Sequence, residues 1–132
     1  MPTTNSVNIG RTSFGGEGKL AVIAGPCVIE SEKHVKFMAE KLVRLAADLD
    51  IPFVVSASAD KANRSSVAGC RGPGLKEGLR ILADNKREFA VPVLSDVHES
   101  NEIAPAAEVL DCLQIPAFLC RQTSFLAAAG RS

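Results

Sequence analysis

The sequence repeats one pattern four times: a short apolar segment, a polar stretch, and a longer segment whose apolar residues recur at helical spacing. The short segments are apolar without strict alternation, which is typical of strands that are covered on both faces. Strands and helices that alternate through short connections form a parallel sheet with crossover helices. The sequence therefore predicts an α/β fold. The predicted strands span residues 19–25, 51–57, 91–96 and 111–116.

A helix is expected after each predicted strand. Ser31 is a good N-cap for the first helix, because its hydroxyl can accept a hydrogen bond from a backbone N–H of the first turn. Pro105 falls within the third helix, where proline removes a backbone donor, so we expect it to begin a second turn or to mark a kink. The predicted helices span residues 32–49, 75–89, 98–110 and 121–130.

Two architectures accommodate four strand–helix units: a small doubly wound sheet and the first half of a (β/α)8 barrel. A chain of 132 residues is long enough for one domain at most. Residues 1–18 are polar and glycine-rich, and we expect an irregular or hairpin lead-in there. Periodicity alone leaves the choice between the two architectures open.

The composition excludes several classes of function. The net charge is 0, which argues against binding to nucleic acid or to an anionic membrane through bulk charge. There is no Trp or Tyr to stack on bases, and no apolar run approaches the roughly 20 residues that cross a bilayer. The N-terminus lacks the apolar centre of a signal peptide, so we expect a cytoplasmic protein without a nucleic-acid or membrane partner. The 4 cysteines are expected to be reduced.

Polar or chemically special residues follow each of the predicted strands. Because parallel strands end at the same edge of a sheet, these residues share one rim, which is where α/β folds bind their ligands. In chain order they are Cys27, then Ser56, Ser58, Asp60 and Lys61, then Ser95, Asp96, His98 and Glu99, and finally Gln114, Pro116 and Ala117.

The loop after the second strand, residues 56–74, carries cations, hydroxyls and glycines. Lys61 supplies a point charge and Arg64 a planar fork of donors, while Asn63 and Ser65 add neutral donors. Glycines at the end of the loop let backbone N–H groups approach an anion closely. This set suits a phosphate or a carboxylate, and the alternative is a solvated surface loop.

Asp96 and His98 place a carboxylate and an imidazole at the end of the third strand, which suits proton transfer or metal binding. The alternative is that Asp96 or Ser95 caps the helix that follows. Cys27 on the same rim is either a thiolate metal ligand or a small buried residue.

Five segments stand in a fixed order along the chain: AGPCVIES, DKANRSS, RGPGLKEGLRIL, DVHE and QIPAFLCRQT. In this order and at this spacing they resemble the 3-deoxy-D-manno-octulosonate 8-phosphate (KDO-8-phosphate) synthases, from about residue 20 to residue 126. The resemblance implies a TIM barrel, with residues 19–132 as the N-terminal half of that domain. It also implies a homotetramer that condenses phosphoenolpyruvate with D-arabinose 5-phosphate, giving phosphate and KDO 8-phosphate, a precursor of lipopolysaccharide.

The resemblance assigns roles to residues of the rim. Lys61 would hold phosphoenolpyruvate, Asp96 would lie beside the reacting centre, and Arg121 would reach the sugar phosphate of a neighbouring subunit. Cysteine at position 27 marks the class of the family that uses a divalent metal ion. The expected catalytic residues are Lys61, Asp96 and His98, and the expected metal ligand is Cys27. The expected substrate-binding residues are Ser58, Lys61, Asn63, Arg64, Ser65, Gln114, Pro116, Ala117 and Arg121.

The chain departs from the family in two ways. Ser56 and Ala59 stand where the family usually has Lys and Phe, and a TIM barrel needs about 250 residues. We therefore expect the isolated chain to be inactive, with the remaining metal ligands in the half that it lacks. Two alternatives stay open: a related synthase of the 3-deoxy-heptulosonate 7-phosphate type, and a non-catalytic half-barrel that binds an anion or pairs with another chain.

Overall fold

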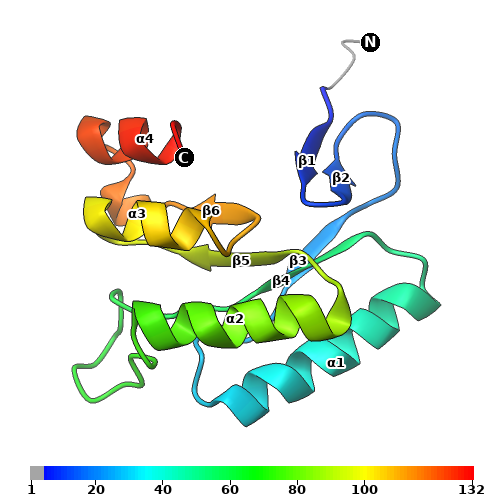
Figure 1. Ribbon diagram of the computed structural model, residues 1–132, viewed down its shortest axis with the longest axis horizontal. Helices are drawn as coiled ribbons and strands as arrows, with labels where there is room; N and C mark the ends of the chain where they lie inside the picture. The colour runs from blue at the N-terminus through cyan, green and yellow to red at the C-terminus, as the bar shows by residue number, and fades with distance from the viewer. Residues whose placement is uncertain (1–4) are drawn as a thin grey trace.

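The computed structural model describes residues 5–132 as a four-stranded parallel sheet with helices packed on it and a hairpin before it (Figure 1). The strands are β1 (Val7–Ile9), β2 (Thr12–Phe14), β3 (Val22–Ala24), β4 (Phe53–Ser56), β5 (Val93–Asp96) and β6 (Cys112–Gln114). The helices are α1 (Glu32–Asp48), α2 (Leu75–Phe89), α3 (Ser100–Ala107) and α4 (Thr123–Ala129), with a 3-10 turn η1 (Ala117–Leu119) before α4.

The order of the strands decides between the two predicted architectures. The sheet runs β3-β4-β5-β6, each strand parallel to the next, so spatial order equals chain order. Each helix also packs against the following one, from α1 to α4, which makes a single helical layer. A doubly wound sheet would reverse its strand order at a switch point and carry helices on both faces. The chain folds as the first half of a TIM barrel, and the prediction of this fold is confirmed.

The core lies between the sheet and this helical layer. Val55 and Val93 are cross-strand partners, and both are 0% exposed on the face that α1 and α2 cover. Val35 of α1 and Leu82 of α2 are also 0% exposed and meet that face. Apolar residues at helical spacing on one side and alternate residues of the strands on the other therefore make one continuous core.

Two predicted helix starts fared differently. The Ser31 cap is confirmed, because the Ser31 hydroxyl accepts a hydrogen bond from the His34 N–H at 3.2 Å. The third helix was expected from residue 98 but begins at Ser100, because the Glu102 carboxylate reaches back and accepts the N–H groups of His98 and Glu99. The prediction of a cap by Asp96 or Ser95 is wrong. Pro105 lies inside α3, in its second turn.

The hairpin of β1 and β2 covers the amino-terminal end of the sheet, opposite the loop that joins β4 to α2 (Figure 1). The Thr12 hydroxyl donates to the Phe53 carbonyl at 3.2 Å, and a side chain at Gly10 would meet Pro92 and Asp111. These contacts lie where β4, β5 and β6 begin. Residues 1–4 of the predicted lead-in lie outside the described residues.

The two outer strands of the parallel sheet, β3 and β6, each have one neighbour within the described part of the chain. Ile23 on β3 is 42% exposed, whereas Val54 on the adjacent strand is 0% exposed. Both outer strands therefore have one edge without a partner strand within residues 5–132. Within residues 5–132, no helix combines the length and the apolar character needed to cross a bilayer.

Candidate functional site

A row of three polar residues crosses the carboxyl-terminal end of the sheet. Asp96 and Gln114 are cross-strand partners, and continuing the register of Ser56 with Leu94 by two residues places Ser58 beside Asp96. The residues that alternate with this row, such as Val55 and Val93, face the helices. Ser58, Asp96 and Gln114 therefore share the opposite face, which in a closed barrel is the interior.

Asp96 is the most buried member of this row. Its side chain is 8% exposed, and the Nε2 atom of His98 lies 3.5 Å from its Oδ2. The Oδ1 atom is buried and has no hydrogen-bond partner among residues 5–132. The His98 ring lies against Phe118, with ring centroids 6.2 Å apart. A carboxylate with one oxygen unsatisfied, next to an imidazole, is suited to accept a hydrogen bond or a proton from a ligand.

The loop between β4 and α2 is fixed at its base by backbone hydrogen bonds. The Ser58 backbone carbonyl accepts a hydrogen bond from the Ile29 N–H at 3.0 Å, and the Ala59 N–H donates to the Ser95 hydroxyl at 3.3 Å. The Ala59 carbonyl in turn accepts the Gly74 N–H at 3.1 Å. Ala59 is 1% exposed, and its Cβ would collide with any side chain at position 78.

Asp60 neutralises one of the arginines of the loop. Its carboxylate accepts two hydrogen bonds from the Arg71 guanidinium, at 2.7 and 3.0 Å. The hydrogen bonds from Arg71 hold the pKa of Asp60 below its usual range, and the nearby His98 and Arg64 lower it further. Burial acts in the opposite direction and raises this pKa. The carboxylate of Asp60 is therefore charged and already paired at neutral pH.

Lys61 and Arg64 are the cations of this loop that remain for a ligand. Arg64 donates from Nη1 to the Lys61 carbonyl at 2.9 Å, which orients its guanidinium, and its Nε is buried without a partner in the described residues. Within the same residues, neither side chain forms an ion pair. A loop with two cations outside any ion pair, one of them oriented, and with an unsatisfied buried donor suits an anion with several oxygens.

The remaining predicted residues are less closely grouped. Asn63 and Ser65 are exposed on the loop, and Arg121 is exposed between η1 and α4. Gln114, at the end of β6, and Ala117, beyond it, are exposed, while Pro116 is buried. The structure thus brings Ser58, Asp96, His98 and Gln114 to one rim with Lys61 and Arg64 above it, and leaves the others at its periphery.

Sequence reasoning missed two features of the site. The spacing of eleven between Asp60 and Arg71 follows no helix or strand period, so it gives no signal for their pairing. The contact between His98 and Phe118 joins two separate strand–helix units. The glycine directly after Arg71 was the one sequence feature that indicated a tight turn there.

Residues 5–132 do not by themselves make a metal centre. Cys27 is exposed after β3, so the alternative that it is a small buried residue is wrong. Among residues 5–132, however, no three side chains of the types His, Cys, Asp or Glu converge on one point. A metal ion would need ligands from outside the described residues.

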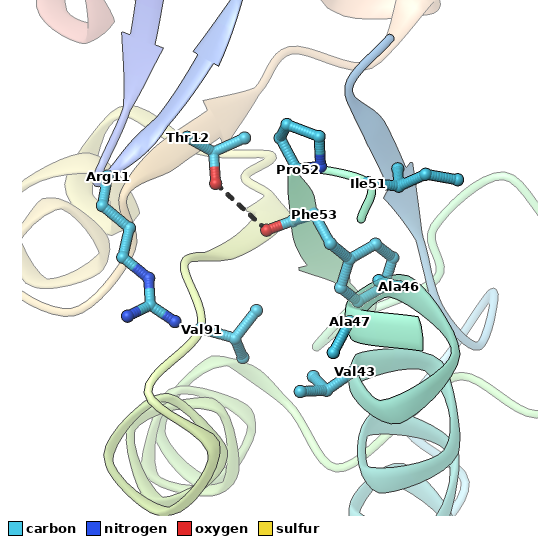
Figure 2. A pocket seen from close by; sticks show the side chains of 9 residues that line it. All are labelled: Arg11, Thr12, Val43, Ala46, Ala47, Ile51, Pro52, Phe53 and Val91. Atoms are coloured by element: carbon cyan, nitrogen blue, oxygen red, sulfur yellow. Dashed lines mark hydrogen bonds between the residues drawn. The ribbon is translucent and has the colours of Figure 1, made fainter. Parts of the chain in front are cut away.

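A cavity of about 280 Å³ lies at the other end of the sheet, between the hairpin and the end of α1 (Figure 2). Its walls are mostly apolar, including Val43, Phe53 and Val91, with the Arg11 side chain at one side (Figure 2). Helix C-termini carry partial negative charge, which disfavours an anion there. The rim, with Lys61 and Arg64 nearby, is therefore the better candidate for an anion site than this cavity.

Comparison with known proteins agrees with the resemblance that the motifs predict. The model of the DAHP synthetase I family matches residues 3–132. The 2-dehydro-3-deoxyphosphooctonate aldolases of Geobacter metallireducens and Citrifermentans bemidjiense are each 54% identical to the chain over 129 residues, covering 98% of this chain and 47% of theirs. The protein of that name from Syntrophotalea carbinolica is 50% identical over 132 residues, covering 100% of this chain and 47% of its own. The chain thus spans about half the length of the curated relatives it matches, and 47% is the share in all three.

Proposed function

The chain belongs to the DAHP synthetase I family, and from this premise we propose that it forms the N-terminal, substrate-binding half of a 3-deoxy-8-phosphooctulonate synthase. The substrates would be phosphoenolpyruvate and D-arabinose 5-phosphate. The observation that carries the proposal is the rim itself: the row Ser58, Asp96 and Gln114 is followed, after Ser58, by a loop whose cations Lys61 and Arg64 form no ion pair in the described residues.

The proposed reaction joins the two substrates through a carbon–carbon bond. The methylene carbon of phosphoenolpyruvate attacks the aldehyde carbon of the sugar phosphate, water adds to the carbon that carries the phosphate, and the carbon–oxygen bond to phosphate breaks. Both substrates are phosphorylated, so the site needs cations for two anions. Lys61 binds phosphoenolpyruvate, and Arg64 binds the sugar phosphate with the neutral donors of Asn63 and Ser65. Preorganised charges of this kind favour the transition state.

Asp96 and His98 supply the acid–base groups of the proposal. The unsatisfied Oδ1 of Asp96 accepts a hydrogen bond from the attacking water or from a sugar hydroxyl. His98 Nε2, 3.5 Å from Oδ2, keeps the carboxylate oriented, and a proton that Asp96 takes from the ligand is shared between the carboxylate and this imidazole. Gln114, Pro116 and Ala117 border the place of the sugar.

Turnover requires the other half of the barrel. The rim of this chain carries four of the eight strands, and its edges β3 and β6 are open within the described residues. We propose that Cys27 gives one thiolate to a divalent metal ion whose other ligands belong to that complementary half. The complete enzyme would be a cytoplasmic homotetramer in which Arg121 faces a neighbouring subunit.

The test is a titration of the chain with phosphoenolpyruvate and D-arabinose 5-phosphate, followed by NMR. Lys61→Ala is expected to weaken phosphoenolpyruvate binding by about tenfold or more, because it removes the cation that holds the anion. Lys33→Ala, at an exposed lysine of α1, is the matched control and should change nothing. Unchanged binding in Lys61→Ala would overturn the proposal. Tighter binding of erythrose 4-phosphate than of arabinose 5-phosphate would favour the heptulosonate-type synthase.

A second function follows from the open edges β3 and β6. Unpaired edges of a parallel sheet are sites for pairing with another chain. A non-catalytic half-barrel would sediment as a dimer or heteromer and show no turnover after addition of a complementary half from a relative. Restored turnover in that mixture would support the synthase instead.

A further inference from the structure

The ends of the cationic loop meet at three contacts that the proposed chemistry does not use. The Arg71 guanidinium donates to both carboxylate oxygens of Asp60, at 2.7 and 3.0 Å. The Lys61 N–H donates to the Arg71 carbonyl at 2.6 Å. Gly72 follows with φ of +99°, and a Cβ there would lie 2.6 Å from the Ala59 carbonyl oxygen. Residues 60–71 are therefore closed into a ring, which we call the clasped loop, and only glycine allows so tight a closure.

The clasp does not have the character of a general stabilising contact. The side chain of Arg71 is 64% exposed, and that of Asp60 is 21% exposed. Exposed ion pairs contribute little to overall stability, although bidentate geometry makes them specific in orientation. The effect of the pair is therefore local to the loop.

Lys61 lies directly inside the closure. Its N–H is held by the Arg71 carbonyl, and its own carbonyl accepts Nη1 of Arg64 at 2.9 Å. Both peptide groups beside the Lys61 side chain are thus fixed by arginines of the same loop. What fixes the backbone at Arg71 therefore also fixes the backbone of Lys61 and, through the Lys61 carbonyl, the guanidinium of Arg64.

We propose that Asp60 and Arg71 are positioning residues, which clasp the loop so that Lys61 and Arg64 are set toward the rim before a phosphate group arrives. This inference rests on the proposed function, because it assumes that the loop binds phosphate. A loop without the clasp must be ordered at the moment of binding, and that ordering weakens affinity. Nε and Nη2 of Arg71 are engaged by Asp60, so the proposal assigns this arginine to holding the loop and not to binding the phosphate.

The direction in which Asp60→Asn changes phosphate affinity distinguishes a positioning role of Arg71 from direct contact with the phosphate. Asp60→Asn removes a negative charge beside the anion site and releases Arg71. If Arg71 binds the phosphate directly, or if charge alone matters, Asp60→Asn tightens binding. If the clasp positions Lys61 and Arg64, Asp60→Asn weakens binding, and so does Arg71→Gln, each by about fivefold to tenfold.

The experiment titrates inorganic phosphate and phosphoenolpyruvate into the wild-type chain, Asp60→Asn, Arg71→Gln and the exchanged pair Asp60→Arg/Arg71→Asp. Glu77→Gln, which removes a carboxylate from an exposed pair with Arg80 on α2, is the matched control. Weaker binding in both single variants, partial recovery in the exchanged pair and no change in Glu77→Gln are expected. Equal or tighter binding in Asp60→Asn overturns the inference.

Hydrogen exchange gives a second readout that does not depend on a ligand. The Lys61 amide is expected to exchange faster in Asp60→Asn and Arg71→Gln, at an unchanged melting temperature. Unchanged exchange of this amide overturns the clasp. If the wild-type chain binds neither phosphate nor phosphoenolpyruvate, the proposed function fails. If it binds both through Lys61 but ignores the clasp variants, only the positioning inference fails.

Discussion

The two ends of the parallel sheet treat their buried carboxylates in opposite ways. At the amino-terminal end, Asp111 accepts the Val93 N–H at 2.9 Å and the Lys86 ammonium at 3.0 Å, so both its oxygens are used. At the carboxyl-terminal end, Asp96 is more buried and yet keeps Oδ1 without a partner in the described residues. Barrel folds place stability at the first end and chemistry at the second. The difference is what we expect if Asp96 serves a ligand and Asp111 serves the fold.

The largest expected effect concerns the backbone at the carboxyl-terminal end of the sheet. There a single substitution should lower stability, contrary to the general contrast between the two ends. A Cβ at Gly25 would lie 1.9 Å from the Ser56 carbonyl oxygen, so the β3 and β4 backbones could not keep their spacing. Gly25→Ala is expected to lower the free energy of unfolding by about 3 kcal/mol. Urea denaturation measures this change. Gly18→Ala, whose nearest new contact is at 3.5 Å, is the control; equal stability of the two variants would refute the assignment.

The next effect tests the amino-terminal end. Asp111→Ala removes the acceptor of the Val93 N–H and the partner of Lys86, and we expect about 2 kcal/mol of lost stability. Affinity for phosphoenolpyruvate should not change in the folded fraction. The exposed neighbour Glu108→Ala serves as control. A stable Asp111→Ala protein with weakened ligand binding would reverse the comparison.

In contrast to Asp111→Ala, Asp96→Asn should weaken ligand binding and leave stability intact. It replaces a buried charge that has one unsatisfied oxygen by a neutral group of the same shape, so stability should stay constant or rise by about 1 kcal/mol. Binding of D-arabinose 5-phosphate should weaken by about tenfold, because the acceptor for a hydroxyl is poorer. Urea denaturation and NMR titration of one preparation give both values. Loss of stability without loss of affinity would make Asp96 a structural residue.

These predictions depend on features that the sequence reveals to different degrees. The strand–helix units, the Ser31 cap and the span Leu75–Phe89 are local, because periodicity and capping are set by neighbours along the chain. The polar ends of the strands also follow from parallel topology. Helix α3 started later than expected because the Glu102 side chain turns back on the chain. The choice of barrel over doubly wound sheet lies in strand order, which is a tertiary property.

The pairing of Asp60 with Arg71 could not be predicted from the sequence either, because it also depends on the tertiary path of the chain. The smallest of the expected effects concerns this pair. Hydrogen bonds from Arg71 lower the pKa of Asp60 in the folded chain relative to the unfolded chain. A carboxyl group with a depressed folded pKa stabilises the fold above its unfolded pKa, about 3.9, and loses that contribution as pH falls through the folded value. The clasped loop should therefore stay closed at neutral pH and open only in acid.

The measurement is a pH titration of the Asp60 carboxyl carbon by NMR, in the wild-type chain and in Arg71→Gln. The midpoint is expected below the ordinary range in the wild type and closer to it in the variant, because the main cause of the shift has been removed. The Lys61 amide, bonded to the Arg71 carbonyl, should lose protection over the same acidic range. If both proteins titrate alike, the charge of Asp60 is not governed by Arg71. The rim would then have no carboxylate dedicated to holding its own loop.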